Sequence, residues 1–108
     1  MTDFEIKRND TSPDLECTLQ GNDGVSVDIT GATVRFHMTK KGETTPKVDA
    51  LATNVDEASG KVKYEWNAAD TDTKGVFRGE FEVTYSDGSI ETFPNNSYIP
   101  INIYEDLA

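Results

Sequence analysis

Few residues in this chain have both the type and the spacing that chemistry requires. The only histidine, His37, and the only cysteine, Cys17, belong to different predicted strands. His37 alternates outward from its strand, whereas Cys17 alternates inward with Leu15 and Leu19. A metal site, or a nucleophile beside its base, needs such groups to converge on one point. The pattern therefore predicts no catalytic residue, no metal site and no cofactor.

Residues 70–75, with the sequence DTDTKG, resemble the start of a calcium-binding loop, in which clustered oxygen atoms surround the ion. Two positions argue against calcium. Lys74 stands where an oxygen ligand should be, and Phe81 takes the place of the closing bidentate glutamate. We therefore predict a turn that precedes a strand.

Three carboxylates, Glu80, Glu82 and Glu91, could become neighbours across the last predicted hairpin. Two such groups with separated pKa values could act as a general acid and a general base. Nothing in the pattern buries them, so a solvated acidic face is expected. The chain is predicted not to be an enzyme.

Charge and hydropathy narrow the range of partners. The chain has 108 residues, with 20 acidic and 10 basic side chains and a net charge of −10. This charge opposes phosphate backbones and anionic lipids, so neither nucleic acid nor a membrane is expected as a partner. No apolar stretch approaches the length of a membrane span, and the amino terminus lacks an export signal. The length suits a single domain over residues 1–108.

Alternation of apolar and polar residues dominates the chain and predicts about eight short strands. The inward residues are Phe4 and Ile6; Leu15, Cys17 and Leu19; Val34, Phe36 and Met38; Val62, Tyr64 and Trp66; Phe77, Phe81 and Val83; and Ile99, Ile101 and Ile103. A weaker edge strand is expected within 47–54, and at most one helical turn within 67–75. The large aromatic residues Phe36, Trp66 and Phe81 are the expected core anchors. This pattern indicates an all-β fold, an antiparallel β-sandwich.

Two hairpins are predicted, and each register depends on how the turn closes. For the first, a three-residue loop at 22–24 keeps the apolar residues on one face and puts Gly24 in the left-handed conformation. The opposed pairs are then Leu19 with Val27 and Cys17 with Ile29. For the second, Asp87-Gly88 predicts a two-residue type I′ turn. The opposed pairs are then Tyr85 with Ile90 and Val83 with Thr92.

Three aromatic residues near the carboxyl end, Phe93, Tyr98 and Tyr104, are predicted to point away from the isoleucine face. Exposed aromatic residues near a sheet edge are typical anchors of protein interfaces. The alternative is that they pack beneath a loop or the amino-terminal segment. Pro100 in the same strand indicates a sheet edge or a bulge.

Several short motifs follow one another in a specific order. The first half contains F-x-I-K-x-N-D-T-x-P over residues 4–13 and V-D-I-T-G-A-x-V-x-F-x-M over residues 27–38. The second half contains G-x-V-x-Y-x-W over 60–66, E-F-x-V-T-Y-x-D-G over 80–88 and T-F-P over 92–94. Together they resemble the amino-terminal domain of phage baseplate upper proteins over nearly the whole chain.

The resemblance implies an immunoglobulin-like module that attaches a peripheral protein to the tail-tip scaffold of a tailed virus and has no active site. The expected function is therefore a non-enzymatic virion structural protein, an adaptor in the tail or baseplate, made in the host cytoplasm. Its expected partners are other virion structural proteins that offer a basic surface to this acidic chain, in a symmetric assembly with multiple copies.

Two alternatives to the adaptor remain open. Baseplate members of the family continue into a long fibre-holding region beyond the point where this chain stops, at Ala108. A capsid, neck or tail-tube decoration protein is therefore the first alternative. The second, from another class, is a glycan-binding module for attachment to the host surface.

Overall fold

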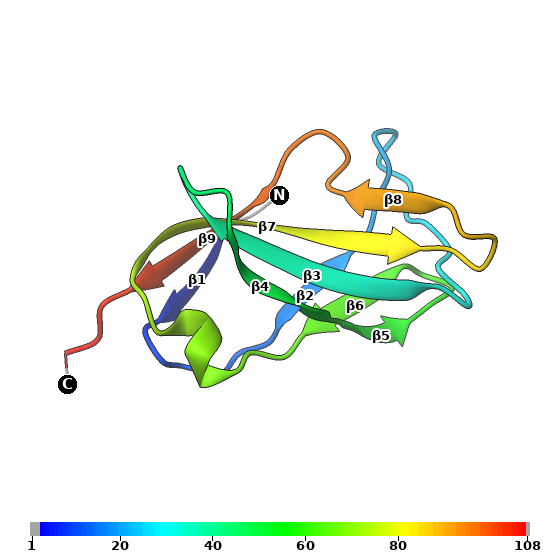
Figure 1. Cartoon of the computed structure of the whole chain (residues 1–108). Coiled ribbons are helices and arrows are strands. Elements are labelled where there is room, and N and C mark those ends of the chain that lie inside the picture. Colours follow the sequence, from blue (N-terminus) through cyan, green and yellow to red (C-terminus); the bar gives the residue numbers. More distant parts are fainter. Residues whose placement is uncertain (1–2, 108) are drawn as a thin grey trace.

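The computed structural model describes residues 3–107, which form nine strands and one short 3₁₀ helix (Figure 1). The elements are β1 (Phe4–Lys7), β2 (Leu15–Thr18), β3 (Thr33–Lys40), β4 (Pro46–Leu51), β5 (Thr53–Asp56), β6 (Lys61–Tyr64), η1 (Ala68–Thr71), β7 (Gly75–Thr84), β8 (Ile90–Phe93) and β9 (Ile99–Tyr104). The all-β class is confirmed. Among the described residues, no helix is long and apolar enough to cross a lipid bilayer.

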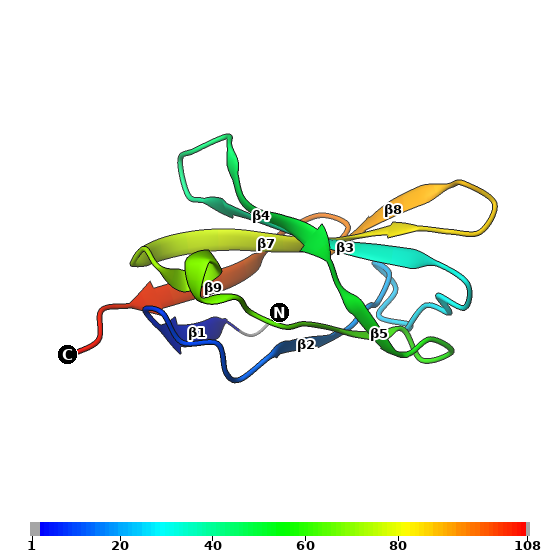
Figure 2. The ribbon, with the colours of Figure 1, turned by 60° about the horizontal axis from the view of Figure 1, so that its bottom comes forward.

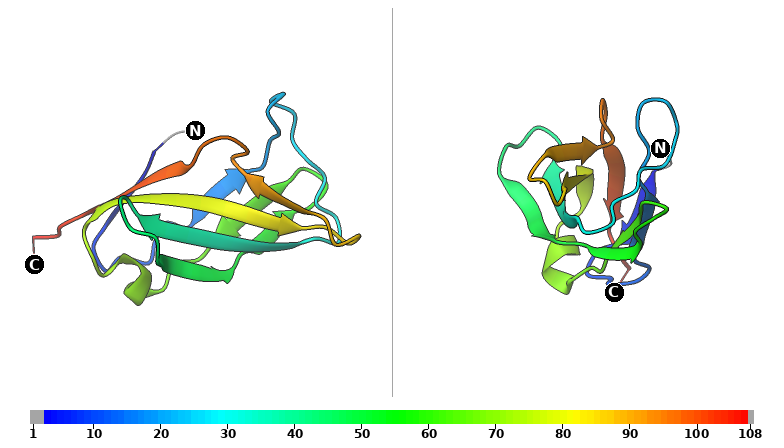
Figure 3. Two further views of the ribbon diagram at one scale, coloured as in Figure 1. Left: turned by 45° about the horizontal axis from the view of Figure 1, so that its top comes forward. Right: turned by 90° about the vertical axis from the view of Figure 1, so that its right-hand side faces the viewer.

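Two sheets face each other as an immunoglobulin-like sandwich (Figures 2 and 3). The six-stranded sheet has the order β1-β9-β7-β3-β4, and β8 also pairs with β7; the three-stranded sheet has the order β2-β6-β5. All pairs are antiparallel except β1 and β9, which run parallel. The prediction of a fully antiparallel sandwich is wrong at this edge. Side chains alternate in the same way in both kinds of pairing, so the sequence pattern could not distinguish them.

The core lies between the two sheets and takes one face of each. The expected anchors Phe36, Trp66 and Phe81 are all buried in it. The ring of Phe36 stacks on Tyr64 with centroids 4.6 Å apart and meets Trp66 edge-on at 5.7 Å. Such aromatic pairs add to the stabilisation that comes from burying their apolar area.

The edge position predicted for 47–54 is confirmed, but the segment belongs to two edge strands and not to one. The chain forms β4 in the six-stranded sheet, changes sheet at Ala52, and continues as β5 in the three-stranded sheet. The backbone N–H of Ala52 still donates to the Val34 carbonyl, at 2.9 Å. Val48, Ala50 and Ala52 keep the same alternation across the change of sheet, so the sequence carries no break that marks it.

The three-residue turn at 22–24 is confirmed. The Gly21 N–H donates to the Val25 carbonyl at 3.1 Å, and the Gly24 N–H donates to the Gly21 carbonyl at 2.9 Å. Gly24 has φ of 77°, a conformation that glycine adopts without a steric penalty.

The register of this first hairpin holds only near its turn. The N–H of Val27 donates to the Leu19 carbonyl at 3.0 Å, as the predicted pairing requires. The predicted pairing of Cys17 with Ile29 is wrong, because Cys17 pairs with Val62 of β6. Ile29 instead donates its N–H to the Glu57 carbonyl at 2.9 Å, since the chain leaves the hairpin to reach the start of β3.

The predicted two-residue turn at Asp87-Gly88 is wrong. The N–H of Tyr85 donates to the Ser89 carbonyl at 2.8 Å, so the loop has three residues and Gly88 takes φ of 89°. Ser89 stabilises this longer loop, because its N–H and hydroxyl donate to the Asp87 carboxylate at 2.9 and 2.6 Å. The observed pairs are Thr84 with Ile90, Val83 with Glu91, Glu82 with Thr92 and Phe81 with Phe93.

Pro100 lies inside a sheet and not on an edge strand or in a bulge, because β9 has β7 on one side and β1 on the other. Pro100 pairs with Arg78 of β7. On the opposite side, the pairing with β1 begins one residue later, where Phe4 meets Ile101. Pro100 therefore needs no backbone donor toward β1, which is the property that confines proline to such positions.

Candidate docking surface

The outer face of the six-stranded sheet gathers exposed apolar side chains. Strand pairing places Leu51 beside Arg35, Val76 beside Asn102 and Ile90 beside Thr84, all with outward side chains. Of the eight exposed large hydrophobic residues that the structure describes, five lie on this face: Leu51, Val76, Ile90, Tyr98 and Tyr104. These five residues are distributed along the sheet, from Val76 at the start of β7 to Ile90 opposite its end, and they make the outer face the candidate docking surface.

The three predicted interface residues have different environments. Tyr98 is 51% exposed and Tyr104 is also exposed. Phe93 is 1% exposed, so its predicted outward position is wrong. The cause is the three-residue turn before β8, because a register shift of one residue moves every side chain of a strand to the other face.

Tyr104 is tied to the neighbouring strand by its hydroxyl group. The hydroxyl donates to the Glu5 carboxylate of β1 at 2.6 Å. This hydrogen bond raises the pKa of Tyr104 above its usual value, because the bond is lost when the phenol ionises. The hydroxyl group of Tyr104 is thus already hydrogen-bonded within the chain, while the side chain remains exposed.

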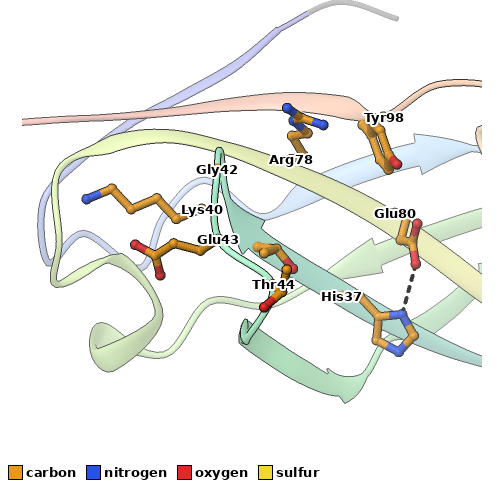
Figure 4. Close-up of a pocket in the computed structure, with 9 residues that line it drawn as sticks. His37, Lys40, Gly42, Glu43, Thr44, Arg78, Glu80 and Tyr98 are labelled. Atoms are coloured by element: carbon orange, nitrogen blue, oxygen red, sulfur yellow. Dashed lines mark hydrogen bonds and ion pairs between the residues drawn. The ribbon is translucent and has the colours of Figure 1, made fainter.

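Tyr98 forms one wall of a groove of about 460 Å³ on this face (Figure 4). The connection between β3 and β4 forms the other wall through residues 42–44. His37 of β3 lies in the floor, as do Arg78 and Glu80 of β7. A second hollow of about 400 Å³ shares Tyr98 and Glu80 and extends over β8 and the residues that follow it.

A chain of charged contacts crosses the floor from β4 to β7. The Arg35 guanidinium donates to the Asp49 carboxylate at 2.9 Å, and this bond lowers the pKa of Asp49. His37, predicted as a surface residue of its strand, is half-buried between Asp49 at 3.3 Å and Glu80 at 3.2 Å. The carboxylates of Asp49 and Glu80 thus each contact a side chain of the neighbouring strand β3.

Arg78 has a different kind of contact. Its guanidinium carbon lies 5.3 Å from the centroid of the Tyr98 ring, within the range of a cation–π interaction. Among the residues that the structure describes, no carboxylate lies within ion-pair distance of Arg78. Alternation predicts that Arg78 points outward but not which groups surround it, so the sequence pattern carries no signal for this contact.

Residues 70–75 resemble a calcium loop, but the carboxylates of this segment already bind other groups of the chain. The Asp70 carboxylate accepts the Tyr64 hydroxyl at 2.6 Å and the Asn67 N–H at 2.9 Å, while Asp72 binds Lys47. Burial, together with the bond to Asp70, raises the pKa of Tyr64. The segment forms η1 and the turn that leads into β7, as predicted. Within residues 3–107, no cluster of three or more potential metal ligands occurs.

Cys17, Glu82 and Glu91 also do not converge on one site. The Cys17 thiol is buried, and burial raises its pKa to about 11. Glu91 pairs with Val83 and accepts the Tyr85 hydroxyl at 2.8 Å. Glu82 lies one position further along, opposite Thr92, so alternation directs Glu82 and Glu91 to opposite faces of the sheet.

Comparison with known families decides the family of this chain. The model of the Rib domain matches residues 32–97, which is more than half of the sequence and extends from just before β3 to just after β8. The chain belongs to the Rib domain family. Rib domains are immunoglobulin-like modules found in surface proteins. The floor of the groove lies within the matched Rib segment, and Tyr98 directly follows it.

The Rib match bears on the resemblance noted in the sequence. It supports the immunoglobulin-like architecture, and it is a coarser assignment than the phage baseplate family. No curated protein matches the chain. The Rib family therefore establishes an immunoglobulin-like module of a surface or structural protein.

Proposed function

We propose that this Rib-family chain is a non-enzymatic docking module of a tailed-virus particle. The observation that carries the docking role is the gathering of five of the eight exposed large hydrophobic residues on one sheet face. Exposed apolar groups next to arginine and tyrosine are the composition that protein interfaces favour. The three-stranded sheet contributes only Val55 to this set of exposed residues.

Docking through the face is better supported than docking through the β4 edge or the β8 edge. An edge strand recruits a partner with its unpaired N–H and carbonyl groups. At the β4 edge, the Arg35 guanidinium donates to the Asp49 carbonyl at 3.0 Å. At the β8 edge, the Asn95 amide donates to the Thr92 carbonyl at 2.9 Å. Both edges thus have backbone acceptors already occupied by side chains.

The virion assignment is supported by the ordered motifs that resemble the baseplate upper protein family, and the Rib match supports only the immunoglobulin-like architecture. In this proposal the chain is an adaptor in the tail or baseplate and occurs in multiple copies within a symmetric assembly. Its net charge of −10 favours partner virion proteins whose docking surface is basic overall. Decoration of the capsid, neck or tail tube is the alternative location.

Mass spectrometry of purified particles of the encoding virus, separated into heads and tails, tests this proposal. Presence in the tail fraction supports the adaptor, and presence in the head fraction supports capsid decoration. Absence from both fractions contradicts a virion role.

A glycan-binding role is the second candidate, and one observation favours it. The exposed ring of Tyr98 adjoins a hollow lined by the amide and hydroxyl groups of residues 95–97. An aromatic platform beside polar side chains suits a sugar ring. A glycan array probed with the wild-type chain and with Tyr98→Ser tests this role. Binding that Tyr98→Ser abolishes supports it, and absence of binding across the array counts against it.

A further inference from the structure

The three arginines of the chain differ in their ionic partners. Arg8 lies 3.1 Å from the Glu105 carboxylate, and Arg35 lies 2.9 Å from the Asp49 carboxylate. Arg78 makes no ion pair with any residue in the described range 3–107. The residues around Arg78 on the sheet explain this difference from the other two arginines.

Strand register places these residues around Arg78. On the outer face, the direct neighbours of Arg78 are Thr39 of β3 and Pro100 of β9, and neither carries a charge. The nearest acidic group on the same face of β7 is Glu80, two residues further along. His37 holds Glu80 from the adjacent strand at 3.2 Å. The sheet therefore keeps its own carboxylates away from the Arg78 guanidinium.

Tyr98 restricts the guanidinium group without using its hydrogen-bond donors. The guanidinium carbon lies 5.3 Å from the ring centroid, and a cation–π contact of this kind does not use the N–H groups as hydrogen-bond donors to another polar group. A planar guanidinium that is already restricted in this way loses less conformational entropy when it binds a carboxylate through two parallel hydrogen bonds. Arg78 lines the floor of the groove, so a ligand in the groove can reach its guanidinium group.

We propose that Arg78 and Tyr98 form the anchor of the docking surface, and that the anchor binds an acidic side chain of a protein partner. This inference rests on the proposed docking function and identifies the chemistry of its central contact. Exposed Val76, two residues before Arg78 on β7, and exposed Tyr104 of β9 share the sheet face with the anchor, which fits a protein interface better than a sugar. The partner surface is thus basic overall, with one carboxylate opposite Arg78.

The test uses a random-peptide display library selected against the full chain. Selected peptides should share an aspartate or a glutamate, and their Kd for Arg78→Ala should rise about tenfold or more. Arg78→Lys should also weaken binding, because lysine keeps the charge but loses the planar fork. Arg8→Ala, which removes an arginine outside the groove, is the matched control and should change Kd by less than about twofold. Replacing the shared acid with its amide should remove the difference between wild type and Arg78→Ala.

Three outcomes would overturn the anchor. One is a set of peptides without a shared acid. Another is peptide binding that is equal in Arg78→Ala and wild type, with the variant shown to be folded by circular dichroism. The third is failure to select any Arg78-dependent peptide while an oligosaccharide of glucuronate binds through Arg78, which would assign the carboxylate to a sugar. None of these outcomes changes where the chain occurs in particles, so failure of the anchor is distinguishable from failure of the virion proposal.

Discussion

The two hairpins of this molecule close with the same turn and then continue differently. In the hairpin of residues 19–27, Gly24 donates its N–H to the carbonyl of Gly21 at 2.9 Å. In the hairpin of residues 81–93, Gly88 donates its N–H to the carbonyl of Tyr85 at the same distance. Both glycines have a positive φ, so each turn is a three-residue loop with glycine at the left-handed position.

An aspartate at the same position organises each loop. The Asp23 carboxylate accepts the N–H of Val25 at 3.0 Å, and the Asp87 carboxylate accepts the N–H of Ser89 at 2.9 Å. This bond between a side chain and the N–H two residues later is a common means of stabilising turns. The residues before the two glycines thus explain why two different sequences adopt one geometry.

The hairpins differ in how far the pairing extends. After the first turn, the chain leaves the pairing and Ile29 bonds to Glu57. After the second turn, the chain remains paired with β7 as far as Phe93. A turn thus fixes the register of a hairpin, while contacts beyond the turn decide how far the paired strands extend. In the second hairpin, the register decides whether Phe93 belongs to the core or to the surface.

The largest expected effect tests the position of Phe93. Phe93→Ala should lower the free energy of unfolding by about 3–5 kcal/mol, because it removes a fully buried aromatic ring and leaves a cavity. Urea unfolding followed by circular dichroism measures the loss. Tyr98→Ala is the matched control and should cost less than about 1 kcal/mol, since Tyr98 is half exposed.

If Phe93→Ala does not fold, Phe93→Leu keeps most of the volume and should cost less than about 1.5 kcal/mol. A Phe93→Ala protein as stable as wild type would restore the predicted outward position of this residue. In that case the three-residue turn before β8 would be wrong.

Sequence alone could predict the fold class and most of the core, because alternation is long and regular in the central strands. Ile99, Ile101 and Ile103 all face inward as predicted. The position of β8 could not be predicted in the same way. Its two large apolar residues, Ile90 and Phe93, are three positions apart, so no strand register can bury both. The turn geometry had to decide between them, and Asp87-Gly88 is compatible with two loop lengths.

The candidate site was predictable only in part. Alternation predicts which side chains are exposed, but it does not predict which other side chains they contact. Tyr98 and Tyr104 are exposed as the alternation of β9 predicts. The contact of Arg78 with Tyr98 depends on the course of the segment that joins β8 to β9. The absence of a carboxylate beside Arg78, among the residues described, depends on the register of β3 and β9 against β7. Neither property has a local sequence signal.

A smaller effect tests whether the two turns are equivalent. Gly24→Ala and Gly88→Ala should each lower the free energy of unfolding by about 1–2 kcal/mol, because alanine is strained at a left-handed φ. Both positions have open space where the new Cβ would lie, so the cost is conformational and not steric. Parallel thermal or urea unfolding of the two variants measures it.

Similar losses are expected for the two variants, because both glycines have a positive φ. A large loss for Gly24→Ala beside no loss for Gly88→Ala would mean that the second turn does not require the left-handed conformation. The two-residue type I′ turn also places Gly88 at a positive φ. Equal losses therefore support a shared requirement for a positive φ. They do not distinguish the two registers of the second hairpin, so a residue after the turn must be substituted as well.

The smallest expected effect makes that distinction. Val25 directly follows the first turn, Ile90 is the second residue after the second turn, and the two are 61% and 63% exposed. Val25→Thr and Ile90→Thr should each change the free energy of unfolding by no more than about 0.5 kcal/mol. In the two-residue register, Ile90 would instead lie opposite Tyr85 on the inner face. A loss of more than about 1 kcal/mol for Ile90→Thr alone, measured by urea unfolding, would therefore favour that register. Two nearly neutral substitutions would show that the hairpins share one geometry, with Phe93 in the core and Ile90 on the docking surface.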